Sequence, residues 1–263
     1  MSTAVKELNR TVPKIPAVAV TNSKGNGRFV LVCEHASNVI PESYKNLGLG
    51  KKALLSHIAW DPGAMEVARL VSKKLDAPLV ASCVSRLLYD CNRPPSVKSA
   101  VSERSEIYNI KGNTNLSKDK LDERAEKFYF PFRNALSECL GSHSRRVDST
   151  ILVTIHTFTP VFQGRPRNMK LGVLHDSDSR MADGVLNALG VSTSLKVVRN
   201  QPYGPRDGVT HTLKEHGTKR GIANVMIEIR NDLVATAEQQ AEIATLLSDA
   251  LILAADGMNS RMG

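Results

Sequence analysis

The sequence predicts an α/β protein, organised as a single three-layer α/β/α domain around a mostly parallel central sheet. Short, nearly continuous apolar runs recur along the chain, which is typical of strands that are covered on both faces. Segments with apolar residues at helical spacing lie between these runs, and this alternation favours a parallel sheet between two helical layers. The chain has 263 residues and no internal repeat or linker, so one large domain accounts for its length.

Six apolar segments are expected to form the strands of this sheet. They cover residues 29–33, 78–84, 151–155, 170–174, 196–199 and 224–229. Residues 1–26 precede the first of them and lack the continuous apolar segment that a secretory signal requires. We therefore expect an N-terminal arm over residues 1–26 and the folded domain over residues 27–263.

Capping residues predict the starts of three helices. Asp61 is the expected N-cap of a helix that has Pro62 at its first position. Ser117 is expected to cap a second helix, which Pro131 should kink or split because proline has no N–H to donate. A capping box at Thr236 begins the last helix, which carries a clear apolar stripe.

The composition disfavours several classes of function. The net charge is +9, but the basic residues are spread along the chain and aromatic residues make up only 5%, so no stacking surface for nucleic acid is indicated. The four cysteines form no C-x-x-C pair, which argues against a thiolate metal site and favours free thiols in a reducing cytoplasm. No apolar run approaches the ~20 residues that cross a bilayer. We expect a cytoplasmic protein without nucleic-acid or membrane partners.

Polar side chains gather where the expected strands end. They are Glu34, His35, Asn38, Arg86, Asp90, Asn92, Arg93, His156, His175, Asp176, Glu228 and Arg230. In open α/β sheets, ligands bind outside the carboxyl ends of the strands. Histidines, carboxylates and arginines at such an edge suit a metal-bound water that attacks a carbonyl, with arginines that hold an anionic substrate. The long polar segments 94–116 and 200–221 are expected to form walls of this site.

Each of the central residues also has a purely structural interpretation. His35 could satisfy a turn, and His156 could be a buried imidazole at the end of its strand. Asp61 has a sufficient role as an N-cap. Glu228 lies inside an apolar strand, where a carboxylate is costly unless it is paired, and Arg230 is the candidate partner two residues on.

Several ordered motifs resemble the N-formylglutamate amidohydrolase family. They are LVCEHASNVIP (31–41), HIAWDPGA (57–64), SRLLYDCNRPP (85–95), IHTFTPVFQGRPR (155–167), LGVLHD (171–176), NQPYGP (200–205), HTLKEHG (211–217) and VMIEIRNDL (225–233). The resemblance runs from about residue 30 to 255. It implies a fold related to the zinc carboxypeptidases and aspartoacylases, with a central mixed sheet between helices.

The resemblance also implies roles for individual residues. His35 and His156 would hold zinc, Asn92 and Arg93 would hold a substrate carboxylate, and Glu228 would be the general base. The related peptidases place a glutamate three residues after the first histidine.

In this chain that position is Asn38, which we group with the substrate-binding residues. The oxygen ligand for the metal must then come from elsewhere. Asp61 is the first choice, with Glu34 and Asn38 as alternatives. Either Arg86 or Arg230 would face the oxyanion of the reaction.

We therefore expect a metal-dependent hydrolase that cleaves the amide bond of N-formyl-L-glutamate or a related N-acyl amino acid, with zinc as the cofactor. Two alternatives stay open. One is a deacylase or peptidase with a different acidic substrate, selected by loops 94–116 and 160–169. The other is a non-catalytic relative that binds anions. The sequence indicates no oligomeric state.

Overall fold

The computed structural model describes residues 15–259, which build a seven-stranded sheet between two helical layers. The strands are β1 (Val18–Thr21), β2 (Phe29–Cys33), β3 (Leu79–Ser82), β6 (Ile151–Phe158), β9 (Leu171–Leu174), β10 (Val197–Arg199) and β11 (Ala223–Arg230). Their order across the sheet is β1-β3-β2-β6-β11-β9-β10. The predicted α/β class and all six predicted strands are confirmed.

The sheet is mixed, and its direction changes twice. The four central strands β3, β2, β6 and β11 are mutually parallel. β9 pairs with β11 in the antiparallel sense, so it ends at the edge where β11 begins. His175 and Asp176 follow β9, and the expectation that they join the other polar residues at one edge is therefore wrong.

The other antiparallel strand is β1, which pairs with β3 at the edge of the sheet. It lies within the region that was expected to be an N-terminal arm, so residues 18–21 of that region are part of the central sheet. The first 14 residues of the expected arm lie outside the described residues. β1 is only half-buried, and an edge strand of this kind leaves a weak apolar signal in the sequence.

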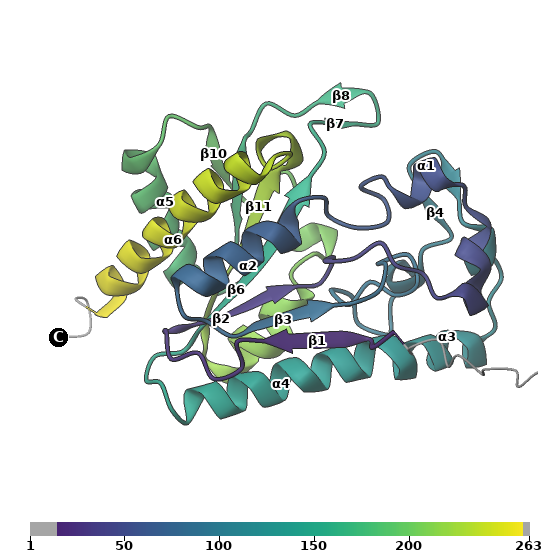
Figure 1. Cartoon of the computed structure of the whole chain (residues 1–263), viewed down its shortest axis with the longest axis horizontal. Coiled ribbons are helices and arrows are strands. Elements are labelled where there is room, and N and C mark those ends of the chain that lie inside the picture. Colours follow the sequence, from purple (N-terminus) through teal and green to yellow (C-terminus); the bar gives the residue numbers. More distant parts are fainter. Residues whose placement is uncertain (1–14, 260–263) are drawn as a thin grey trace, which may run out of the picture.

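Helices cover both faces of the sheet (Figure 1). One layer contains α2 (Ala64–Lys74), α5 (Arg180–Ser192) and α6 (Ala237–Asn259), and the other contains α3 (Lys118–Arg124) and α4 (Phe130–Ser144). The inward-facing residues alternate along the strands: Val153 and Ile155 of β6 pack in the core beneath α2, α5 and α6, whereas Leu152 packs toward α4. The same alternation places His156 and Glu228 on the α4 face of the sheet, near its carboxyl end.

The start of α2 differs from the prediction. The helix begins at Ala64, and its N-cap is Gly63, with φ of 82°. A side chain at position 63 would also meet Val234 at 2.6 Å, so both the backbone conformation and the space require glycine. Asp61 accepts the Ala64 N–H through its backbone carbonyl only. Its carboxylate is therefore not a helix cap and turns toward the end of the sheet.

The other helix signals are confirmed. The Ser117 hydroxyl accepts the Lys120 N–H at the start of α3. The expected second helix is split ahead of Pro131, because a π-turn over Ala125–Tyr129 separates α3 from α4. At α6, the Gln239 N–H donates to the Thr236 hydroxyl at 3.3 Å and the Thr236 N–H donates to Gln239 Oε1 at 3.1 Å.

The long connections carry small elements of their own. They are the short helix α1 (Lys51–Leu54), the hairpin of β4 (Arg104–Ser105) with β5 (Tyr108–Asn109), and the hairpin of β7 (Val161–Phe162) with β8 (Arg165–Pro166). Both hairpins and the segment 200–221 contribute residues to a cavity at the carboxyl end of the parallel strands. The two predicted long loops thus do supply walls of a site.

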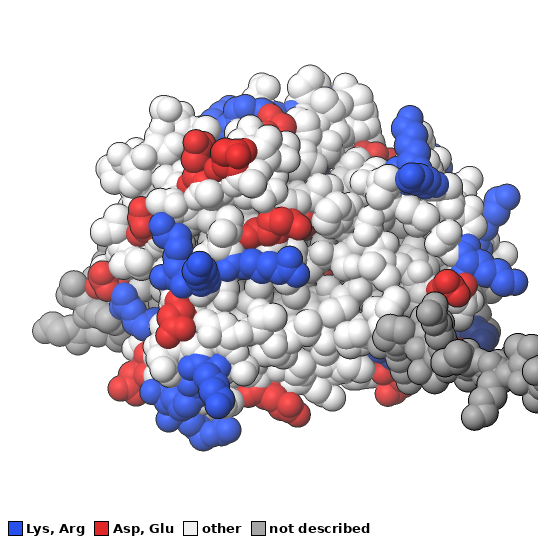
Figure 2. Space-filling model, in the orientation of Figure 1, with Lys and Arg blue, Asp and Glu red and all other residues white. Residues whose placement is uncertain are grey.

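The surface shows how the charge is distributed. On the face drawn in Figure 2, basic and acidic side chains are interspersed, and broad areas carry neither. No helix within residues 15–259 is long and apolar enough to cross a membrane. The expectation that nucleic acid is not a partner stays a prediction.

Candidate active site

A cavity of about 340 Å³ opens at the carboxyl ends of the four parallel strands. Its wall includes His35, Asp61, Arg86, Asp90, Asn92, Arg93, His156, Tyr203 and Glu228. The parallel direction of β2, β3, β6 and β11 explains why residues far apart in the sequence meet here, since each strand delivers its last residues to the same edge.

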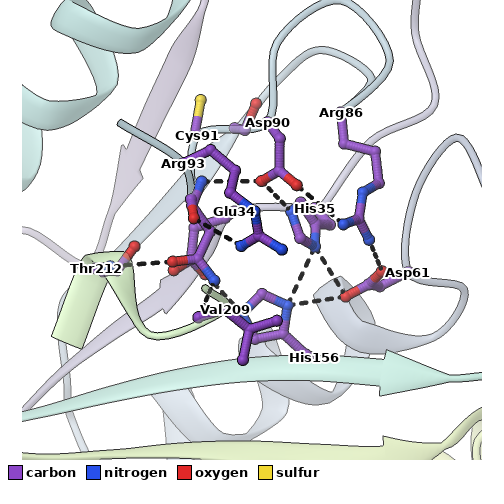
Figure 3. Close-up of polar contacts among 12 residues, drawn as sticks. Glu34, His35, Asp61, Arg86, Asp90, Cys91, Arg93, His156, Val209 and Thr212 are labelled. Atoms are coloured by element: carbon purple, nitrogen blue, oxygen red, sulfur yellow. Dashed lines mark hydrogen bonds and ion pairs between the residues drawn. The ribbon is translucent and has the colours of Figure 1, made fainter. Parts of the chain in front are cut away.

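Two histidines and one aspartate point at a common position in this cavity (Figure 3). His35 Nδ1 and His156 Nδ1 lie 3.2 Å apart, and Asp61 Oδ2 lies 3.2 Å from the first and 2.9 Å from the second. All three residues are buried, with 2–4% of their surface exposed. The Thr157 N–H donates to the same Asp61 oxygen at 3.3 Å and holds the carboxylate in place.

The outer nitrogen of each imidazole faces a second carboxylate. His35 Nε2 lies 2.8 Å from Asp90 Oδ1, and His156 Nε2 lies 3.1 Å from Glu34 Oε2. These acids favour the tautomer with the proton on Nε2, which leaves the Nδ1 lone pair of each ring directed at the common position. Glu34, an alternative ligand in the sequence analysis, is thus the outer partner of His156.

The three inner atoms fit a divalent cation. Two Nδ1 lone pairs and a carboxylate oxygen are all acceptors, and within 3.2 Å of one another they repel unless a proton or cation lies between them. Tetrahedral zinc with ligands at about 2.0–2.1 Å separates its donor atoms by roughly 3.3 Å, close to the spacing seen here. Carboxylates that orient ligating histidines from outside are the usual companions of such sites.

Arg86 links the carboxylates on the two sides of His35. Its Nη1 lies 3.3 Å from Asp61 Oδ1, and its Nη2 lies 2.9 Å from Asp90 Oδ2. Burial alone would raise the pKa of both aspartates, but His35 and His156 outweigh burial at Asp61, and His35, Arg86 and Arg93 outweigh it at Asp90, so both pKa values lie below their usual range. Both acids are therefore ionised, and Arg86 offsets part of their charge.

Of the carboxylates in the cavity wall, Glu228 has the properties that suit a general base best. It stands opposite His156 in the register of β11 and β6, and it lines the cavity while only 5% exposed. Its Oε2 has no hydrogen-bond partner among residues 15–259. Burial raises the pKa of Glu228 to about 7, with a further upward contribution from Asp61 that the histidines oppose. A carboxyl with this pKa can both accept and release a proton near neutrality.

Two of the expected site residues lie elsewhere. Arg230 does not line the cavity, because its Nε and Nη2 bind Asp232 at 2.7 and 2.8 Å and its Nη1 donates to the Arg167 carbonyl. It is therefore not the partner of Glu228. Asn38 is also absent from the wall, and its amide donates to the Leu54 carbonyl at 3.0 Å.

Asn92 and Arg93 line the cavity, but both also hold the loop above it. The Asn92 amide donates to the Val209 carbonyl at 2.5 Å and accepts the Thr212 N–H at 3.0 Å. Arg93 Nη1 donates to the Gly208 carbonyl at 2.8 Å and to the Asn92 carbonyl at 2.9 Å. The amide of Asn92 is thus engaged in anchoring the segment 208–212.

Comparison with known proteins places this geometry in a family. A family model described as N-formylglutamate amidohydrolase matches residues 27–235. The chain belongs to the N-formylglutamate amidohydrolase family. Members of this family hydrolyse amide bonds, so the protein is an enzyme of the amidohydrolase class, and the resemblance read from the motifs is confirmed.

Two solved structures share the fold of this chain. A gene product from Agrobacterium tumefaciens is 48% identical, with a TM-score of 0.90 over 93% of this chain and 96% of that chain. The N-formylglutamate amidohydrolase from Ralstonia eutropha JMP134 is 17% identical, with a TM-score of 0.64 over 94% of this chain and all of that chain. At this identity the second likeness supports the fold alone. No curated protein sequence matches the chain.

Two residues of this amidohydrolase site were assigned no role in the sequence analysis. Asp90, one of the polar residues at the strand ends, lies 2.8 Å from the outer nitrogen of His35, and no local sequence pattern marks that contact. Tyr203 lines the cavity from the segment 200–221, where the motif NQPYGP marks it. His211 binds the Tyr129 hydroxyl at 2.8 Å and does not line this cavity.

Proposed function

We propose that the protein hydrolyses the amide bond of N-formyl-L-glutamate or a closely related N-acyl amino acid, with zinc held by His35, Asp61 and His156. One observation carries the proposal: two imidazole lone pairs and a carboxylate oxygen converge within 3.2 Å while acids orient both rings from outside. A bound zinc ion supplies a Lewis acid and lowers the pKa of its water toward ~7.

Glu228 is proposed as the residue that moves the proton. Its Oε2 is unpartnered within the described chain, and its pKa of about 7 suits acceptance of a proton from the attacking water. The same carboxyl then delivers the proton to the leaving nitrogen, because an amine is expelled only after it is protonated. Arg86 is the arginine of the cavity wall nearest to this chemistry, so of the two candidates it is the proposed contact for the oxyanion.

Arg93 is proposed to hold a substrate carboxylate. It lines the cavity, and only its Nη1 is committed to the backbone carbonyls of Asn92 and Gly208 by the hydrogen bonds described above. A guanidinium can present its other N–H groups to a carboxylate as a fork. Asn92 is proposed to support this contact by holding the loop.

The free cysteines of the described chain also favour a cytoplasmic location, which we propose.

The test combines metal analysis with a matched substrate panel. The zinc-loaded protein is assayed with N-formyl-L-glutamate, N-formyl-L-glutamine and N-acetyl-L-glutamate, and release of the free amino acid is measured. We expect about one zinc per chain. We also expect kcat/KM for the glutamate compound to exceed that for the glutamine compound at least about tenfold, because a charged side-chain carboxylate is lost in the latter.

The panel separates the proposal from its alternative. Hydrolysis of another acidic acyl compound in preference to both formyl substrates would favour a deacylase with a different substrate. Arg93→Met should remove the preference for glutamate, whereas Arg69→Met, a change at an exposed position of α2, should leave it unchanged. Protein with zinc bound that hydrolyses none of the panel would contradict the proposal.

A further inference from the structure

Arg167, which the sequence analysis did not place in the site, packs against the outer side of residues that line the cavity. Arg167 follows β8, and its Nη2 donates to the Tyr203 hydroxyl at 3.0 Å. Its Cζ lies 4.5 Å from the ring centre of Phe162, 4.8 Å from that of Tyr203 and 5.7 Å from that of Phe158. All three aromatic residues line the cavity, while Arg167 itself does not. The guanidinium thus lies behind an aromatic wall.

The backbone of Arg167 is held at both ends. Its N–H donates to the Pro160 carbonyl at 2.8 Å, which closes the β7–β8 hairpin. Its carbonyl accepts from Arg230 Nη1 at 2.8 Å, and Asp232 holds Arg230 through two further hydrogen bonds. Arg230, at the end of β11, therefore fixes the position of Arg167. This contact explains why the Arg230 side chain is directed away from the cavity.

The burial of the Arg167 guanidinium lowers the stability of the fold, so it calls for a functional explanation. Arg167 Nη1 is buried and has no hydrogen-bond partner among residues 15–259. A buried guanidinium N–H without an acceptor lowers stability, and contacts with aromatic faces compensate only in part. A hairpin could be attached to the loop by apolar contacts alone, so the guanidinium is better explained by its hydrogen bond to Tyr203.

The hydrogen bond decides where the phenol hydrogen points. Arginine can only donate, so the Tyr203 oxygen accepts from Arg167 and its own O–H remains available to another acceptor. The ring packs against the cluster that contains Met226, and Met226 shares the β11 face of Glu228. Burial raises the pKa of Tyr203, and Glu228 raises it further, so the phenol stays protonated near neutrality.

We infer that Arg167 is a positioning residue, which orients Tyr203 so that the phenol O–H donates a hydrogen bond to an oxygen of the substrate in the cavity. The inference rests on the proposed function, because the substrate is the N-acyl amino acid named there. Tyr203 touches the substrate, and Arg167 acts only through Tyr203. A different role, in which Arg167 itself binds a substrate carboxylate, makes the opposite prediction for the double variant.

The experiment is a double-variant cycle on the zinc-loaded protein with N-formyl-L-glutamate. Tyr203→Phe removes the hydroxyl and keeps the ring, and Arg167→Met removes the donors while keeping an unbranched apolar stem. Arg167→Lys retains a cation and a donor. Arg165→Met, at an exposed position of the same hairpin, is the matched control. Thermal unfolding and zinc content are measured for every variant.

We expect Tyr203→Phe to lower kcat/KM by about 10- to 100-fold, the effect of one oriented hydrogen bond to a reacting molecule. Arg167→Met should lower it about tenfold or more, and Arg167→Lys should restore part of the loss. In the Tyr203→Phe background, Arg167→Met should have no further effect, because there is no hydroxyl left to orient. Arg165→Met should match the wild type.

Two outcomes would overturn the inference alone. One is full activity of Tyr203→Phe beside an active wild type. The other is a loss in the double variant equal to the product of the two single losses, which would mean that Arg167 acts independently of the phenol. A wild type that binds zinc but hydrolyses no compound of the panel would instead overturn the proposed function, and the inference would fall with it.

Discussion

Glu228 of β11 and His156 of β6 stand opposite each other in the register of two parallel strands, with both side chains on the face that lines the cavity. Each residue is nearly fully buried. Acidic oxygens lie 2.9 Å from His156 Nδ1 and 3.1 Å from its Nε2, and Glu228 keeps an oxygen without a hydrogen-bond partner in the described chain. The register thus sets an oriented imidazole beside an unpaired acid, which is the arrangement that metal-assisted hydrolysis needs.

Glu228→Gln tests the role of the unpaired acid. The substitution keeps the shape of the side chain but removes its ability to exchange a proton, so we expect kcat to fall by about 10²- to 10⁴-fold. Zinc content should not change, because Glu228 is not one of the three converging residues. The midpoint of thermal unfolding should stay the same or rise, since a buried acid without a partner is costly. A variant with more than half of the wild-type kcat would show that another group moves the proton.

His35→Ala and His156→Ala test the metal site. Each change removes one of only three converging donor atoms, so we expect both variants to lose bound zinc after dialysis and to become inactive. His175→Ala is the control, because this histidine lies at the other end of the sheet and does not line the cavity. Metal analysis after dialysis provides the measurement. Unchanged zinc stoichiometry in either of the first two variants would exclude that residue as a ligand.

Asp90→Asn tests the outer partner of His35. The amide oxygen is neutral, so it no longer offers a charged acceptor to the N–H of His35 Nε2. The substitution also removes one of the two carboxylates that Arg86 contacts, and Asp61 remains. We expect zinc affinity to fall by about 10- to 100-fold, the usual effect of such outer contacts. Competition with a chelator of known affinity measures this change. Asp183→Asn, which removes a surface partner of Arg199, should leave the affinity unaltered.

More of the fold than of the site could be predicted from the sequence, because burial of a strand leaves a local pattern and strand direction does not. Continuous apolar runs such as 151–155 report burial on both faces, and the strands appear where these runs lie. Strand direction leaves no such mark, so the antiparallel course of β9 and the displacement of His175 were not predicted. Asp61 was the first choice of oxygen ligand because Asn38 stands where the related peptidases have a glutamate, although the local sequence around Asp61 indicated an N-cap.

The outer contacts of the site could not be predicted from local patterns. Asp90 and Glu34 act through the histidines they face, and those contacts exist only after distant strands pair. Arg230 lies on the expected face of its strand by alternation, but Asp232 and the Arg167 carbonyl engage it at the strand end. Side-chain direction at the end of a strand depends on such neighbours more than on the period of the strand.

His216 makes a prediction about stability that is independent of catalysis. Burial lowers its pKa from 6.5 to about 4, with help from Arg220, His211 and Arg133 against Glu215. The folded protein therefore keeps this imidazole neutral, while the unfolded chain takes up a proton below about pH 6.5. The contribution of His216 to stability is complete above that pH and is lost progressively as the pH falls toward 4. Between about pH 8 and pH 5 the loss amounts to about 2 kcal/mol.

His216→Gln isolates this contribution, because the amide is polar but does not titrate. The free energy of unfolding is measured by denaturant titration across this pH range for both proteins. Subtracting the variant from the wild type removes the contributions of His143 and of the cavity histidines, which the two proteins share. The difference should decrease by about 2 kcal/mol from the higher to the lower pH. A difference that is constant with pH would mean that His216 titrates alike in the folded and the unfolded protein.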